Sequence, residues 1–227
     1  RKNRARMQCP EGLAKSKISV FFFGFFDKFI KMIMQLHIMK DLGVFQKEFK
    51  KLDLDLQVHA IMLIDICKEI AIISNRKLDE KKLIACTVLH DSKNHEENHA
   101  VVSAEYAKKF LKKEDFSDKF IKDVFEAIYN HTDKPKVKDF TIACFYDSDI
   151  LCRFYALGVL RAWNNIKSDP NRDWKNLFKE IAKKQNLKNY LEKMNKKLQL
   201  QASKKLLQSK KEEYLFSHEL LGKIIFE

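Results

Sequence analysis

Histidine and aspartate side chains interrupt the apolar faces of several predicted helices, and this placement limits the folds open to the chain. The stretch Thr87-Val88-Leu89-His90-Asp91 ends an apolar helix that is predicted to begin near Asp79. Burying a polar side chain costs free energy unless a hydrogen bond or a metal ion compensates for the lost water. A fold that buries this doublet must therefore bring other polar groups to meet it.

Few residues in the chain break helices. Among 227 residues there are 5 Gly and 3 Pro, with 45% hydrophobic and 33% charged residues, so the sequence indicates an all-α protein. We expect a basic arm and a Phe-rich N-terminal helix in residues 1–50, packed on a helical domain in residues 51–227. Helices are predicted over residues 56–74, 79–91, 99–113, 117–131 and 139–165, with about two or three more after Trp174.

The formal charge of +13 makes a polyanionic partner plausible. The lysines are spread along the whole chain, which favours the simpler interpretation that they form solvated helix faces. The five cysteines show no paired spacing, and all but Cys9 lie in apolar helical stretches. This pattern is typical of reduced, buried thiols in a cytoplasmic protein.

Residues 18–26 form a short Phe-rich stretch after the basic arm. It is shorter than the roughly 20 residues of a membrane-spanning helix, and it lacks the cleavage site of a signal peptide. We expect it to pack on the core, with a weak membrane contact or a partner-binding role as alternatives. Because its phenylalanines cover more than one side of a helix, we also expect a second subunit or a membrane interface to cover part of it. The phenylalanines are Phe21, Phe22, Phe23, Phe25 and Phe26.

Helical phase selects the polar residues that point into the core. Side chains at positions i, i+3, i+4 and i+7 share one face of a helix. This test turns the following side chains inward: His59, His90, His99, His131 and Asp147. The same test turns Asp149 away from the face of Asp147. One such histidine is usually a hydrogen-bonded core residue, but the set favours a shared metal site, with a metal-free hydrogen-bond network as the alternative.

The order of these residues resembles that of the HD-domain metal-dependent phosphohydrolases. In that family a lone histidine precedes a His-Asp doublet and a distal aspartate, which match His59, His90-Asp91 and Asp147. Further matching segments are His99–Glu105, Ala127–His131, Asp147–Leu151 and the C-terminal run from Tyr190 to Leu220. The resemblance implies an HD-domain helical bundle, with the N-terminal helix and the C-terminal helices as additions.

The resemblance also implies a ligand set. Carried over residue by residue, the ligands of one divalent ion are His59, His90, Asp91 and Asp147. The ion is expected to be Mn, Fe, Ni, Zn, Co or Mg. The family positions of a second metal or a bound phosphate match His99 and His131, and His95 is a further candidate. The chain departs from the family after the doublet, where the glycine turn is absent and Lys93 comes one position early.

The implied function is hydrolysis of a phosphoester by metal-activated water. Asp91 would orient or deprotonate that water, with Lys93 also near the reaction, while Lys93 and Arg153 would bind substrate phosphate. We expect a nucleotide or another small phosphorylated metabolite as substrate, and a homo-oligomer. The alternative is a non-catalytic HD module that binds a nucleotide or a protein partner. A nuclease ranks lower, because no basic stripe with interleaved aromatic residues accompanies the site.

Overall fold

The computed structural model describes residues 43–168, 173, 176, 180 and 183–226. The expectations for the basic arm, the Phe-rich helix and its membrane or subunit contacts lie outside these residues. In the described part every regular element is helical, which confirms the all-α prediction. The elements are α2 (Val44–Lys51), α3 (Leu54–Ser74), α4 (Glu80–Leu89), α5 (His99–Lys113), α6 (Asp118–Tyr129), α7 (Phe140–Leu151), the 3-10 turn η2 (Cys152–Phe154), α8 (Ala156–Ser168), α10 (Lys184–Lys197) and α11 (Gln201–Phe226).

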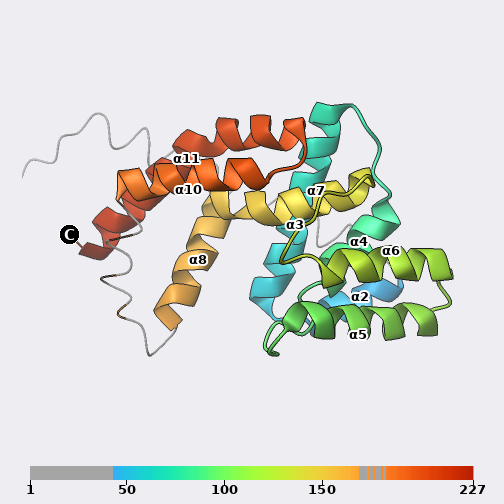
Figure 1. The fold of residues 1–227 in the computed structure, drawn as a ribbon. Helices are drawn as coiled ribbons and strands as arrows, with labels where there is room; N and C mark the ends of the chain where they lie inside the picture. Colours follow the sequence, from blue (N-terminus) through green and yellow to red (C-terminus); the bar gives the residue numbers. More distant parts are fainter. Residues whose placement is uncertain (1–42, 169–172, 174–175, 177–179, 181–182, 227) are drawn as a thin grey trace, which may run out of the picture. The chain divides into compact units, whose positions relative to one another are not determined.

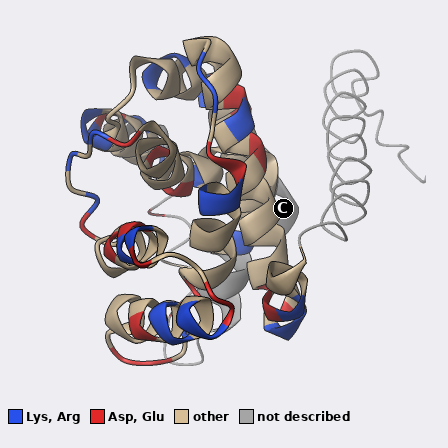
Figure 2. Ribbon diagram, turned by 90° about the vertical axis from the view of Figure 1, so that its right-hand side faces the viewer, with Lys and Arg blue, Asp and Glu red and all other residues tan. Residues whose placement is uncertain are grey.

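The long helix α3 packs against α4 and α7 (Figure 1). These three helices carry about half of the buried hydrophobic residues in the described part of the chain. The pair α5 and α6 lies side by side and contacts α4, while α11 runs beside α10 and contacts α3, α7 and α8. None of the described helices is long and apolar enough to cross a membrane. Lys and Arg are spread over most of the described helices, as expected for solvated faces (Figure 2).

Local capping chemistry sets where several helices begin. The side chains of Asp53, Asp79, Ser117 and Asp139 each accept a hydrogen bond from a backbone N–H in the first turn of the helix that follows. Such a cap contributes about 1 kcal/mol, because it satisfies a donor that the helix itself cannot. The predicted starts at Asp79 and Ser117 are confirmed.

The predicted single helix over residues 139–165 is wrong. The chain leaves α7 through η2, and Tyr155 then adopts an extended conformation with φ −91° and ψ 150° before α8 begins. Close packing accompanies this break: a Cβ atom built on Gly158 would lie 1.8 Å from the Cys152 carbonyl oxygen. The absence of a side chain at Gly158 therefore lets α8 lie directly on the η2 backbone.

Lys82 joins elements that are distant in sequence. Its Nζ lies 2.9 Å from Asp123 Oδ2 on α6 and 2.7 Å from Asp139 Oδ2 before α7. Burial favours a lower pKa for Lys82, but both carboxylates raise it, and the net pKa is raised. Burial favours a higher pKa for Asp139, but the hydrogen bonds from Lys82 and from the Ile142 N–H outweigh it, and the net pKa is lowered.

We predict that Lys82→Met lowers the free energy of unfolding at pH 7 by about 1–3 kcal/mol, between the values for exposed and fully buried ion pairs. Asp139 has a lowered pKa, so its contribution is present above the ordinary Asp value of about 3.9 and is lost as pH falls through the folded-state value. The contribution of Lys82 is present below the ordinary Lys value of about 10.4. Urea unfolding at pH 7 and in acid measures the effect. The difference in free energy of unfolding between wild type and variant should become smaller in acid. Lys77 is exposed, so the control variant Lys77→Met should leave the free energy of unfolding unchanged at both pH values.

Candidate metal centre

Helices α3, α4 and α7 bring His59, His90 and Asp149 together around Asp91. His90 Nε2 lies 3.2 Å and His59 Nε2 lies 3.9 Å from the same oxygen, Asp91 Oδ2. His59 Nε2 also lies 3.3 Å from Asp149 Oδ1. His59 and His90 are buried, with ring centroids 5.2 Å apart. This half of the site therefore offers two imidazole nitrogens and two carboxylates at short range.

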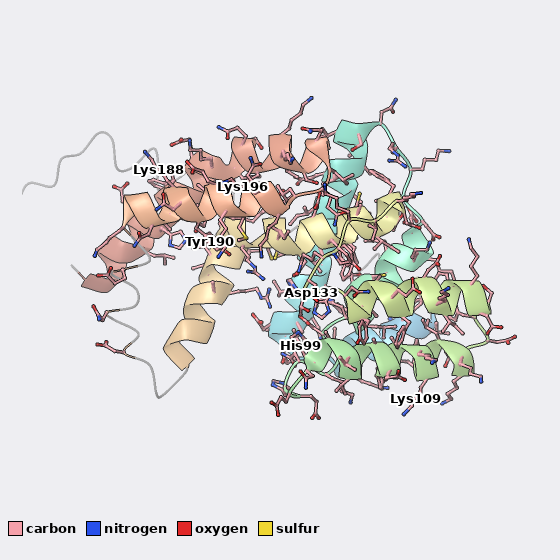
Figure 3. The ribbon with its side chains drawn as sticks, viewed as in Figure 1. His99, Lys109, Asp133, Lys188, Tyr190 and Lys196 are labelled. Carbon is pink, nitrogen blue, oxygen red and sulfur yellow. The ribbon has the colours of Figure 1, made fainter. Side chains whose placement is uncertain are left out.

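The other oxygen of Asp91 faces a second pair of histidines. His131 Nε2 lies 3.5 Å and His99 Nε2 lies 3.9 Å from Asp91 Oδ1. The His131 side chain is 5% exposed, whereas that of His99 is 36% exposed, so the site opens to solvent at His99. Figure 3 shows His99 at the start of α5 and Asp133 in the loop after α6, at the same end of this helix pair. The carboxylate of Asp91 thus lies between two pairs of imidazoles.

Backbone carbonyls fix the tautomers of two of these histidines. His90 Nδ1 lies 3.0 Å from the Thr87 carbonyl oxygen, and His131 Nδ1 lies 2.7 Å from the Ile128 carbonyl oxygen. A carbonyl oxygen can only accept, so each Nδ1 carries a proton, and in the neutral form of each ring the lone pair of Nε2 would point toward Asp91. His90 Nε2 is buried without a hydrogen-bond partner in the described structure. A lone pair that faces a carboxylate needs a proton or a cation between them, and this arrangement fits a metal ion.

The electrostatics of the site also fit a cation. Burial favours a higher pKa for Asp91, but His90 and His131 outweigh it and hold the pKa well below its usual range. Burial also favours a higher pKa for Asp149, but the nearby His59 and Lys134 outweigh this effect, and the net pKa is lowered. For His59 burial is the largest cause, and the net pKa is lowered. Near neutral pH the site therefore combines two carboxylates with a neutral His59 imidazole.

The placement of the two α7 carboxylates corrects the sequence-based expectation. Asp149, and not Asp147, lies beside His59. Asp147 is fully buried, and its two oxygens accept hydrogen bonds from the backbone N–H groups of Gln199 and Leu200, each at 2.9 Å. Every residue of α7 is buried, so this helix has no solvent-facing side from which phase could be judged. Residues i and i+2 point to different sides of a helix, so Asp147 meets the start of α11 while Asp149 meets α3.

The other residues predicted to contact substrate have partners or surroundings of their own. The Lys93 ammonium lies 4.9 Å from the centroid of the Tyr106 ring, and the Lys93 N–H donates to Ser103. The His95 side chain is 85% exposed. Arg153 is exposed and donates to the hydroxyl of Tyr190 at 3.3 Å. The structure therefore does not place Lys93 or His95 at the cluster, and it gives Arg153 a partner on α10.

Lys134 is a cation at the cluster that no sequence pattern indicated. Its Nζ lies 2.7 Å from Asp149 Oδ2, and the side chain is 11% exposed. The same ammonium donates to the carbonyl oxygen of His131. Lys134 lies in a polar loop of several lysines, and no local pattern distinguishes it from Lys136 or Lys138. Its role is visible only from the tertiary structure.

Comparisons with known proteins bear on the family and the fold of this chain. The family model described as HD domain matches residues 56–193, more than half of the chain. No curated protein matches. A solved structure, the crystal structure of a predicted HD superfamily hydrolase from an uncultured Thermotogales bacterium, is similar over 83% of this chain and 91% of its own, with 21% identity and a TM-score of 0.51. At that identity the likeness shows a shared fold. The extent of the family match shows that the chain belongs to the HD domain family.

Proposed function

We propose that the protein is a divalent-metal-dependent phosphohydrolase that cleaves a phosphoester of a nucleotide or of another small phosphorylated metabolite. The observation that carries the proposal is the position of Asp91, whose two oxygens each face a pair of histidine Nε2 atoms. Membership of the HD domain family supports the same reaction class.

The residues on each side of Asp91 would hold the metal. His59, His90 and Asp91 form one group whose ligand atoms lie within 4.8 Å of one another, and Asp91, His99 and His131 form another. Asp149 adds a carboxylate to the first group through its contact with His59. We assign the second group to a second ion or to a phosphate oxygen. Mixed imidazole and carboxylate ligands suit Mn, Fe, Co, Ni or Zn.

The chain's own residues have distinct parts in this proposal. A bound divalent ion lowers the pKa of water and neutralises charge on phosphoryl oxygens. Asp91 is ionised, partly exposed and central, so it is placed to hold the ion and to orient the attacking water. His99 stands at the open side, where a phosphoryl oxygen would enter. Lys134 forms an ion pair with Asp149 Oδ2, the oxygen that does not face His59.

A substrate panel tests the proposal. With Mn²⁺ present, we expect the purified protein to release phosphate or nucleoside from at least one nucleotide or phosphorylated metabolite. Asp91→Asn removes the carboxylate that stands between the two groups of proposed ligands, and it should lower the turnover number by about 100-fold or more, beyond the range for residues that only orient a ligand. Asp133 is exposed in the loop after α6, so the control variant Asp133→Asn should leave the turnover number unchanged. A panel without turnover by protein shown to contain metal would contradict the proposed reaction and favour a binding module.

Metal removal gives an independent check. Dialysis against EDTA should abolish hydrolysis, and added Mn²⁺, Co²⁺ or Zn²⁺ should restore it. Elemental analysis of the protein as purified would identify the ion. Full activity in chelator, with no ion detected, would contradict metal dependence.

A further inference from the structure

One side chain ties the start of α11 to the loop before α7. Gln199 lies between α10 and α11, and its Nε2 donates to the carbonyl oxygens of Pro135 at 3.1 Å and Lys134 at 3.5 Å. Its Oε1 accepts a hydrogen bond from the backbone N–H of Val137 at 3.1 Å. A single amide therefore holds three backbone groups of a polar loop that lies more than 60 residues earlier in the chain.

That loop holds Lys134 in an uncommon conformation. Lys134 has φ 52°, in the left-handed region that residues other than glycine rarely adopt. Such a conformation persists only where surrounding contacts hold it. Here the Lys134 N–H donates to the Asn130 carbonyl oxygen at 2.8 Å, and Gln199 contacts the carbonyl side of the same residue.

From this position Lys134 controls the orientation of Asp149. The ammonium of Lys134 forms an ion pair with Asp149 Oδ2 at 2.7 Å, and the other oxygen, Oδ1, faces His59 Nε2 at 3.3 Å. Gln199 is itself anchored on the same helix, because its backbone N–H donates to Asp147 Oδ1 at 2.9 Å. The two α7 carboxylates are thus linked through Gln199 and Lys134.

We propose that Gln199 is a positioning residue for the metal centre, acting through the loop from which Lys134 orients Asp149. The proposal rests on the proposed function in that it takes Asp149 as a ligand of the ion. Gln199 lies beyond residues 56–193, which the HD domain model matches. The segment between α10 and α11 is accordingly a working part of the site in this chain.

The test is the dissociation constant of Mn²⁺, measured by calorimetry on the full chain. Gln199→Ala changes neither the charge nor a ligand, and it should weaken Mn²⁺ binding by about 10–100-fold, the usual effect of removing a group that orients a ligand. Lys134→Met should also weaken binding, although loss of a positive charge would by itself strengthen it. In the double variant the two effects should not add, because both act through the same contact. Lys136→Met removes the same charge from the same loop and should not weaken binding.

Stability measurements separate positioning from general damage to the fold. If Gln199→Ala lowers the melting temperature but leaves the Mn²⁺ dissociation constant unchanged, the proposal is overturned. A wild type that binds no Mn²⁺ would contradict the proposed function instead. The orientation of Asp149 would then be read in the metal-free protein from the side-chain ¹⁵N shifts of His59. Gln199→Ala should change these shifts and Lys136→Met should not, and unchanged shifts in Gln199→Ala would overturn the proposal.

Discussion

Asp149→Asn is expected to weaken Mn²⁺ binding by more than about 100-fold, beyond the range for residues that only orient a ligand. The variant keeps the shape of the side chain but removes the negative charge that faces His59 Nε2 at 3.3 Å. An amide is a poorer ligand for a divalent ion than a carboxylate, and its NH₂ group can also turn toward the metal. Hydrolysis should be lost together with binding. Calorimetry with Mn²⁺ and the phosphate-release assay measure the two effects separately.

Asp147→Asn is the matched control, because the two carboxylates lie on the same helix. Asp147 accepts backbone N–H groups with both oxygens, so the amide would direct its NH₂ group at one of these donors. Leaving a buried donor unsatisfied costs about 1–3 kcal/mol. We therefore expect a loss of stability in urea and a change in Mn²⁺ affinity smaller than that of Asp149→Asn. If Asp147→Asn weakened Mn²⁺ binding more than Asp149→Asn did, Asp147 would be the ligand instead.

Gly158→Ala is expected to lower the free energy of unfolding by about 3 kcal/mol or more, at the upper end of the range for overpacking. The added Cβ would lie 1.8 Å from the Cys152 carbonyl oxygen, and this backbone group cannot rotate out of the way as a side chain could. α8 would have to move away from η2, which directly follows the helix that carries Asp149. Urea unfolding measures the loss.

Gly43→Ala provides the comparison for this substitution. Gly43 has φ 54° and ψ −121°, which residues with a Cβ rarely adopt, and no atom lies within 4 Å of the added Cβ, so only backbone strain of about 1–3 kcal/mol is expected. A loss at Gly158 no larger than that at Gly43 would show that the close packing is relieved at little cost. A Gly158→Ala protein as stable as wild type would show that α8 can shift freely.

The sequence was sufficient to predict features with local causes. The starts of α4 and α6 follow from the capping side chains of Asp79 and Ser117, whose hydrogen bonds reach only the next turn. His59 and His90 are buried, as their helical phase predicted. The order and phase of the histidines were therefore enough to anticipate the cluster around Asp91.

Features with tertiary causes could not be predicted. Asp147 and Asp149 were interchanged because α7 is buried on all sides, and only the positions of α3 and α11 decide which carboxylate meets which partner. Lys134 and Gln199 lie in polar segments whose significance comes from contacts across the fold. The break after α7 was missed because Tyr155 gives no local signal, and Gly158 explains it only once α8 is seen to lie on η2.

The most direct test of the account is anomalous diffraction at the manganese edge from crystals grown with Mn²⁺. We predict an anomalous peak within bonding distance of Asp91 Oδ2 and of the Nε2 atoms of His59 and His90, with Asp149 as a further ligand and Asp147 still bonded to the start of α11. A peak coordinated by Asp147, or a structure at saturating Mn²⁺ with no peak beside Asp91, would contradict it.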